Sequence, residues 1–340
     1  MTDLSDYQQV LTPNYGVPPT IIVKGVGCEL FGQDGARYLD LAGGIAVSAL
    51  GHCHPDVVQA LTEQANKVWH LSNVLANEPA IHLAKALVDA TFADRVFFCN
   101  SGAEAVEAGI KAVRRYFFHN DKKRYKIICV NNAFHGRTLG AIAAAGQKKM
   151  LQGFDPHLEG FVHVDFNDLK QIEKKIDKHT AAIFIETVQG EGGITPAKKD
   201  YLVGLKNLAK KHGILLYFDE VQCGVGRTGK FLAVDWIKNL QPNLVSIAKG
   251  IGGGFPLGAL LLDKKVSKTM TKGSHGSTYG GNPLAMSVAD VVLSYVLKED
   301  FLDHVRYIGY NLRKALKDNI VKKFPNLVCG VITKFVNAAI

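Results

Sequence analysis

Short apolar runs alternate with amphipathic stretches from about residue 80 onward, and this alternation limits the possible folds more than any other feature. The runs are apolar on both faces and rich in Ile, Val and Phe, as in strands covered on both sides. They lie at residues 95–99, 126–130, 181–186, 214–219, 244–248 and 259–262. Amphipathic stretches at 103–118, 167–176 and 198–212 separate several of them. The pattern predicts an α/β fold, with a mostly parallel sheet and helices on both faces.

The chain is long enough for one large domain and a smaller one, since 47% of its 340 residues are hydrophobic. We expect a large domain over residues 47–290. Residues 1–46 carry turn signals and a predicted hairpin, and we assign them to a small domain together with residues 291–340. Helices are predicted at 284–297 and 300–318.

The net charge of +9 comes from scattered lysines at helical spacing, which is typical of solvated helix faces. No arginine-rich run with interleaved aromatics is present, which argues against nucleic-acid binding. No apolar run reaches membrane-spanning length, so no membrane association is expected. The first ten residues do not resemble a secretory signal, and the six cysteines form no CxxC pair. These features predict a cytoplasmic protein without disulfides.

Charged residues stand at the carboxyl ends of two predicted strands, where parallel sheets collect their ligands. Lys249 follows the 244–248 run and precedes four glycines in five positions. A strand-end lysine often just reaches solvent, but partial desolvation favours the neutral amine that forms Schiff bases. Asp219 and Glu220 follow each other at another strand end. Neighbouring strand residues point to opposite faces, so we expect these two acids to lie in different environments.

The start of the helix predicted at 103–118 is a candidate anion site. Asn100 or Ser101 can cap it, and Gly102 lets the backbone approach a ligand. The first N–H groups of a helix are free and attract anions, although an ordinary capped helix shows the same pattern.

The loop after the 126–130 run offers Phe134, His135 and Arg137. The guanidinium fork of Arg137 suits a substrate carboxylate. His135 taken alone is interpreted as structural.

Two further motifs are interpreted as structural. GVGRTG at 224–229 fits a dinucleotide loop or a Walker A loop poorly, because Phe231 replaces the required Ser or Thr and no acid follows at the usual distance. GHCHP at 51–55 has two histidines but no further ligand set, so a turn and a helix start before Pro55 are favoured over a metal.

A lysine, a strand-end aspartate, a helix N-terminus and an aromatic side chain together match the needs of pyridoxal 5′-phosphate (PLP). The aspartate keeps the pyridine nitrogen protonated, the helix start holds the phosphate, and the lysine amine reacts. The sequence therefore predicts a PLP site and no metal.

The motifs resemble those of the class III, fold-type I aminotransferases, and within them the acetylornithine aminotransferases, followed by the ornithine aminotransferases. The matching segments occur in the family's order at residues 100–105, 134–138, 186–193, 219–229, 248–259 and 275–285. The resemblance implies the fold-type I PLP-dependent transferase fold, with a seven-stranded sheet and a small α+β domain.

The resemblance also implies roles for individual residues. Lys249 would form the Schiff base, and Asp219 would pair with the pyridine nitrogen. Thr278 would reach the phosphate in the neighbouring subunit, which implies a homodimer. The other implied cofactor contacts are Ser101, Gly102, Ala103, Phe134, Val221 and Gln222. The implied substrate contacts are Arg137, Glu186, Glu191 and Ser277.

The implied reaction is ping-pong transamination of N-acetylornithine with 2-oxoglutarate, which gives N-acetylglutamate semialdehyde and glutamate in arginine biosynthesis. The alternatives are ornithine, succinylornithine or 4-aminobutyrate as amino donor, or a truncated remnant that at most binds PLP.

The sequence departs from the family pattern in two places. The family continues for tens of residues beyond this end, and the segment after about Val328 does not match it, so we expect a truncated or frame-shifted C-terminus and an incomplete small domain. The arginine that usually partners Glu191 lies in that missing part. Residues 72–79 also lack the aromatics that the family often has near Ala76.

Overall fold

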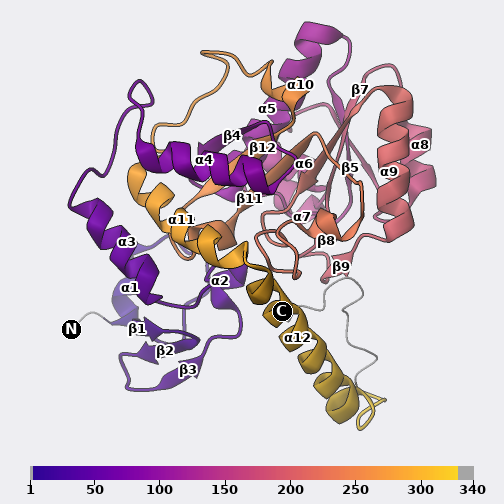
Figure 1. Cartoon of the computed structure of the whole chain (residues 1–340). Coiled ribbons are helices and arrows are strands. Elements are labelled where there is room, and N and C mark those ends of the chain that lie inside the picture. The colour runs from indigo at the N-terminus through magenta and orange to yellow at the C-terminus, as the bar shows by residue number, and fades with distance from the viewer. Residues whose placement is uncertain (1–2, 328–340) are drawn as a thin grey trace.

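The computed structural model describes residues 3–327, and its centre is a seven-stranded sheet (Figure 1). The strand order is β4-β12-β11-β10-β7-β5-β6. All neighbouring pairs are parallel except those of β12, which is antiparallel to both β4 and β11. The mostly parallel sheet predicted from the sequence is confirmed. The strands are β4 (Arg95–Cys99), β5 (Lys126–Val130), β6 (Phe161–Val164), β7 (Thr180–Glu186), β10 (Leu215–Asp219), β11 (Leu244–Ala248) and β12 (Gly258–Leu262).

Two hydrophobic clusters cover the two faces of this sheet, and alternate residues of each strand contribute to each cluster. In β10, Leu215 and Tyr217 belong to one cluster and Leu216 and Phe218 to the other. The cluster of Tyr217 includes residues of α5 (Gly102–Asn120) and α6 (Leu139–Ala145). The other cluster includes residues of α4 (Glu78–Ala90), α8 (Leu169–Lys175), α9 (Lys199–His212) and α11 (Pro283–Val296).

The six strands predicted from apolar runs are present to within one residue at each end, and the predicted helices are present with shifts of up to two residues. Strand β6 and helix α4 were not predicted. A helix, α3 (Pro55–Ala65), begins at Pro55 as the GHCHP motif indicated. The remaining elements are α1 (Leu4–Val10), α2 (Gly43–Ala46), α7 (Lys148–Leu151), β8 (Val188–Gln189), β9 (Thr195–Pro196), η1 (Ala233–Trp236), η2 (Lys249–Gly252), α10 (Lys264–Ser267), α12 (Glu299–Leu316) and η3 (Lys317–Val321).

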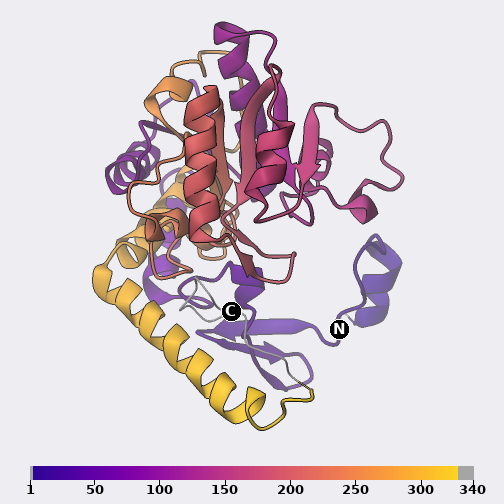
Figure 2. The ribbon, with the colours of Figure 1, turned by 90° about the vertical axis from the view of Figure 1, so that its right-hand side faces the viewer.

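The N-terminal part forms a three-stranded antiparallel sheet of its own, rather than the single predicted hairpin. Its strands are β1 (Ile22–Val26), β2 (Glu29–Gly32) and β3 (Arg37–Leu39). Helix α12 extends away from the main sheet toward this small sheet (Figure 2). Residues between Gly27 and His54 and residues of α12 line a common cavity of about 650 Å³. The tail after Val328, for which we expect a shifted frame, lies outside the described residues.

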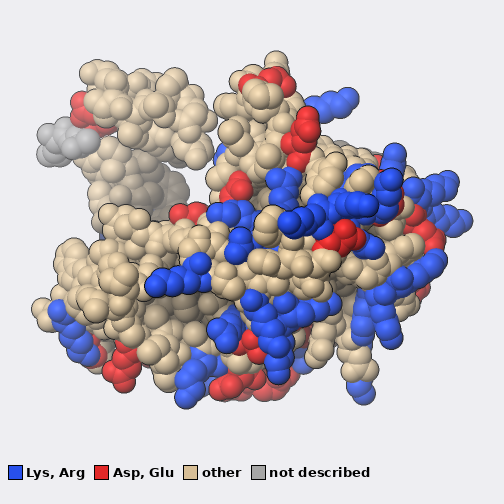
Figure 3. Space-filling view, turned by 90° about the horizontal axis from the view of Figure 1, so that it is seen from above, with Lys and Arg blue, Asp and Glu red and all other residues tan. Residues whose placement is uncertain are grey.

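The surface carries charges of both signs. Seen from above, Lys and Arg side chains gather on the right-hand side, where acidic side chains are interspersed among them (Figure 3). Within residues 3–327, no helix is both long enough and apolar enough to cross a membrane.

Candidate active site

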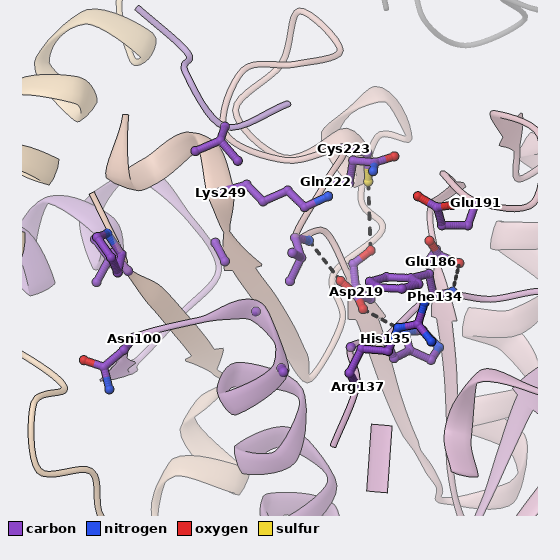
Figure 4. A pocket seen from close by; sticks show the side chains of 18 of the residues that line it. Asn100, Phe134, His135, Arg137, Glu186, Glu191, Asp219, Gln222, Cys223 and Lys249 are labelled. Carbon is purple, nitrogen blue, oxygen red and sulfur yellow. Dashed lines mark hydrogen bonds and ion pairs between the residues drawn. The ribbon is translucent and has the colours of Figure 1, made fainter. Parts of the chain in front are cut away.

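A cavity of about 420 Å³ lies at the carboxyl ends of the central strands, beside the first turn of α5 (Figure 4). Its volume is in the range of small-molecule sites. Ten of the thirteen residues predicted for the site line it, and three do not. Those that line it are Gly102, Ala103, Phe134, Arg137, Glu186, Glu191, Asp219, Val221, Gln222 and Lys249.

Lys249 directly follows β11, and its side chain extends across the cavity toward Gln222 (Figure 4). Its φ of 48° lies in the left-handed region, which lysine rarely adopts and which costs about 1–3 kcal/mol. Burial lowers the pKa of the Lys249 amine, although the charges of Asp219 and Glu191 oppose the shift. The amine is therefore closer to its neutral, nucleophilic form than a lysine in water.

Asp219 ends β10 and is 3% exposed. Its Oδ2 lies 2.7 Å from His135 Nδ1, and its Oδ1 accepts a hydrogen bond of 2.9 Å from the backbone N–H of Val221. The His135 ring stacks on Phe184 with 4.1 Å between the ring centroids. The carboxylate is thus held at both oxygens and faces the cavity in a fixed orientation.

His135 is a site residue that the sequence interpretation missed, because it was treated as structural. It is 2% exposed and lines the cavity. The signal that could have revealed it is its place directly after Phe134, which is itself a site candidate. Asn100, Val47, Cys223 and Phe255 also line the cavity and were not predicted as site residues.

Glu220 lies on the other side of the chain from Asp219, as the strand alternation predicted. It does not line the cavity. Its carboxyl group accepts hydrogen bonds from the backbone N–H groups of Ala233 at 2.5 Å and Val234 at 2.8 Å, and from Thr187 Oγ1 at 3.2 Å. Complete burial raises the pKa of Glu220 to about 8. The second acid of the pair, Glu220, therefore holds the start of η1 close to the end of β10.

Ser101 caps α5, since its Oγ accepts a hydrogen bond of 3.2 Å from Glu104 N. Its side chain is used in this way and does not line the cavity. Gly102 and Ala103 do line it, and backbone N–H groups in the first helical turn have no intrahelical partner. A Cβ on Gly102 would lie 2.6 Å from Val221 Cγ1, so any larger residue there would displace Val221.

Phe134 and Arg137 form one wall, with the guanidinium 5.7 Å from the centroid of the Phe134 ring. Glu186, the last residue of β7, is 5% exposed and accepts hydrogen bonds of 3.2 Å from Phe134 N and from Gly190 N. Arg137 and Glu191 are exposed, and neither forms an ion pair with another residue of the described chain. Both are available to a charged ligand.

Ser277 and Thr278 lie apart from the cavity lining. Ser277 Oγ accepts a hydrogen bond of 3.2 Å from Asn100 Nδ2, and Asn100 lines the cavity. Thr278 is exposed and lines none of the described cavities.

The donor set fits PLP. Two free backbone N–H groups and the positive end of α5 suit a phosphate, the Asp219 carboxylate suits a protonated ring nitrogen, and Lys249 supplies an amine. The cavity also has an aromatic ring, Phe134, that can stack on a heterocycle. Within the described part of the chain, no group of three His, Cys, Asp or Glu side chains could hold a metal ion.

Comparison with known proteins identifies the family. The model of the class III aminotransferases matches residues 10–330. The chain is 51% identical over 311 residues to an acetylornithine aminotransferase of Mesorhizobium japonicum, covering 91% of this chain and 77% of that relative. It is 48% identical to a succinylornithine transaminase/acetylornithine aminotransferase of Pseudomonas aeruginosa, covering 89% of this chain and 74% of that relative.

A crystal structure of the ornithine aminotransferase from Toxoplasma gondii superimposes with a TM-score of 0.90 at 31% identity, covering 96% of this chain and 79% of the other. The chain belongs to the class III aminotransferase family. Its members depend on PLP, so the protein is a PLP-dependent aminotransferase that acts on amino-acid and keto-acid substrates.

Proposed function

We propose that the protein transfers the terminal amino group of N-acetylornithine to 2-oxoglutarate and produces N-acetylglutamate semialdehyde and glutamate. The observation that carries amino transfer is the convergence of Lys249, Asp219 and Arg137 on one cavity. The choice of amino donor is supported by two relatives whose sequences are 51% and 48% identical to this chain. Both have acetylornithine aminotransferase in their names. Arginine biosynthesis as the pathway and the cytoplasm as the location stay predictions.

The cavity residues divide the work of holding PLP. The N–H groups of Gly102 and Ala103 would bind the phosphate at the start of α5, which Ser101 caps. Asp219, oriented by His135, would pair with the ring nitrogen. Phe134 and Val221 would cover the two ring faces, and Gln222 would hydrogen-bond the phenolic oxygen.

The bound cofactor supplies an electron sink that weakens the bond to hydrogen at the substrate carbon bearing the amine. Lys249 Nζ, whose pKa is lowered by burial, would take that proton and return it to the cofactor. Asp219 would stabilise the positive charge of a protonated ring nitrogen. Because one site serves both the amine and the keto acid, the two half-reactions alternate.

Arg137 would bind a substrate carboxylate, because its guanidinium is exposed to the cavity. We propose Glu191 and Ser277 as further substrate contacts, with Ser277 acting next to Asn100. Thr278 of the partner subunit would complete the phosphate site, so the active form would be a homodimer.

The same proposal extends to domain organisation. Residues 47–290 would form the large PLP-binding domain, and residues 1–46 and 291–340 would belong to a small domain. The separate sheet β1–β3 supports this division, as does the cavity that Gly27, Cys28 and Asp40, which flank its strands, line together with residues of α12.

A spectral half-reaction assay tests the donor. The PLP-loaded protein is mixed with N-acetylornithine, ornithine, succinylornithine or 4-aminobutyrate in turn, and the visible band of the bound cofactor is followed. We expect N-acetylornithine to bleach the band fastest and 2-oxoglutarate to restore it. Faster bleaching by another amine would reassign the donor, and binding of PLP without reaction of any amine would favour the remnant.

A further inference from the structure

We propose that Glu186 is a positioning residue that fixes two walls of the PLP pocket, and that it does not bind substrate. The inference rests on the proposed function only in taking the cavity as the PLP site. Both carboxyl oxygens already have backbone partners, since Oε2 accepts from Phe134 N and Oε1 accepts from Gly190 N, each at 3.2 Å. The side chain is 5% exposed, so little of it is open to a ligand.

The first wall is the segment that carries the Phe134 ring. Two other side chains support this segment, because Gln189 Nε2 donates to Asn131 O at 2.8 Å and Gln147 Nε2 donates to Ala133 O at 2.7 Å. The Glu186 bond is made by Phe134 itself. It therefore acts nearest to the ring that would stack on the cofactor.

The second wall is the contact between Gly190 and Gln222. A Cβ on Gly190 would overlap Gln222 Oε1, so the backbone of Gly190 lies directly against that amide. Glu186 fixes Gly190 through its N–H, and Gly190 in turn limits where the Gln222 amide can lie. One buried carboxyl group thus sets the spacing between Phe134 and Gln222 (Figure 4).

The charge balance of the site agrees with this role. Glu186 and Asp219 are partners in the register of two parallel strands, so both face the cavity from neighbouring positions. Burial and the charge of Asp219 raise the pKa of Glu186 well above its usual value. The carboxyl group has acceptor capacity for the two backbone hydrogen bonds in either protonation state, so the positioning role does not depend on its charge.

The decisive variant is Glu186→Gln, studied with PLP itself as the probe. Glutamine keeps the size of the side chain but has a single acceptor oxygen, so its NH₂ group meets one of the two backbone donors. We expect the Kd for PLP to rise about tenfold, which corresponds to ~1.4 kcal/mol. In the cofactor-free protein, amide hydrogen exchange should become faster in residues 131–137 and 187–193.

Three further variants provide an alternative test and two controls. Gly190→Ala leaves Glu186 in place but displaces Gln222, and it should also raise the Kd for PLP, which keeps the test valid if Glu186→Gln does not fold. Glu191→Gln removes a proposed substrate contact, so it should change KM for the amino donor and leave exchange in 131–137 unchanged. Glu173→Gln, at an exposed acid paired with Lys211, serves as the background control.

Wild-type PLP affinity and wild-type exchange in Glu186→Gln would overturn the proposal, whether or not KM for the amino donor changes. The two readouts involve no amino donor. They therefore stay informative if N-acetylornithine is not the substrate, and the two proposals can fail separately.

Discussion

The replacement Glu220→Gln should change how the stability of the protein depends on pH. Glu220 is completely buried and accepts three hydrogen bonds, and its pKa is raised from 4.5 to about 8. An acid whose pKa is higher in the folded state than in the unfolded state holds its proton more tightly when folded. The stability that this tighter proton binding gives the folded state is fully present below about pH 4.5. It is lost as the pH rises toward 8.

The size of the effect follows from the shift. One pKa unit is worth about 1.4 kcal/mol, so the free energy of unfolding should fall by about 3 kcal/mol between pH 5.5 and pH 8 because of this group alone. Glutamine does not titrate, and it has one acceptor oxygen instead of two. Glu220→Gln should therefore be ~1–3 kcal/mol less stable than the wild type at pH 5.5. Its own stability should lack the loss at high pH, so the difference from the wild type should narrow as the pH rises to 8.

Thermal unfolding of the cofactor-free proteins at the two pH values measures the difference, and omitting PLP removes the pH dependence of cofactor binding. For 340 residues the entropy of unfolding is about 0.7 kcal/mol/K, so the Tm advantage of the wild type should shrink by about 4 °C from pH 5.5 to pH 8. Glu173→Gln should show no such change. An equal Tm difference at both pH values would refute the assigned protonation of Glu220.

Three more outcomes are expected. Lys249→Ala should abolish the visible band of bound PLP and lower turnover by at least about 10²–10⁴-fold, and a retained band would contradict the role of the amine. Gly102→Ala should raise the Kd for PLP by about tenfold, because the new Cβ meets Val221; unchanged equilibrium binding would show that the start of α5 does not hold the phosphate. Arg137→Ala should raise KM for 2-oxoglutarate by about 10- to 100-fold, with Arg137→Lys in between, and equal KM values in all three proteins would remove Arg137 from the carboxylate site.

The sequence predicted the central strands because they are buried on both faces and so read as continuous apolar runs. Strand β6 was not predicted because it lies at the edge of the sheet and pairs only with β5. His163 also interrupts its apolar run. Helix α4 was missed although its start carries ordinary signals, since Asn77 caps it and Pro79 lies in its first turn. The sheet β1–β3 has one strand more than the predicted hairpin, because turn signals alone do not reveal how many strands a segment forms.

The site was predictable where a residue type is informative by itself, and less so where its partner is distant. Lys249 and Asp219 each end an apolar run, which the sequence displays directly. The bond between His135 and Asp219 depends on β5 and β10 lying on either side of β7, and strand order cannot be deduced from local patterns. Likewise the sequence allowed Asn100 or Ser101 as the cap of α5, and only the structure shows that Ser101 caps it while Asn100 reaches Ser277.

The left-handed backbone of Lys249 has an evolutionary consequence. At φ 48° a glycine is unstrained, so exchange of this lysine for glycine would relieve a backbone cost of ~1–3 kcal/mol. A chain selected for stability alone would be expected to drift toward glycine at this position, which directly precedes a stretch with four glycines in five residues. The lysine is therefore a stability burden that selection for chemistry would sustain, and its replacement by glycine would be an early mark of a lineage released from that selection.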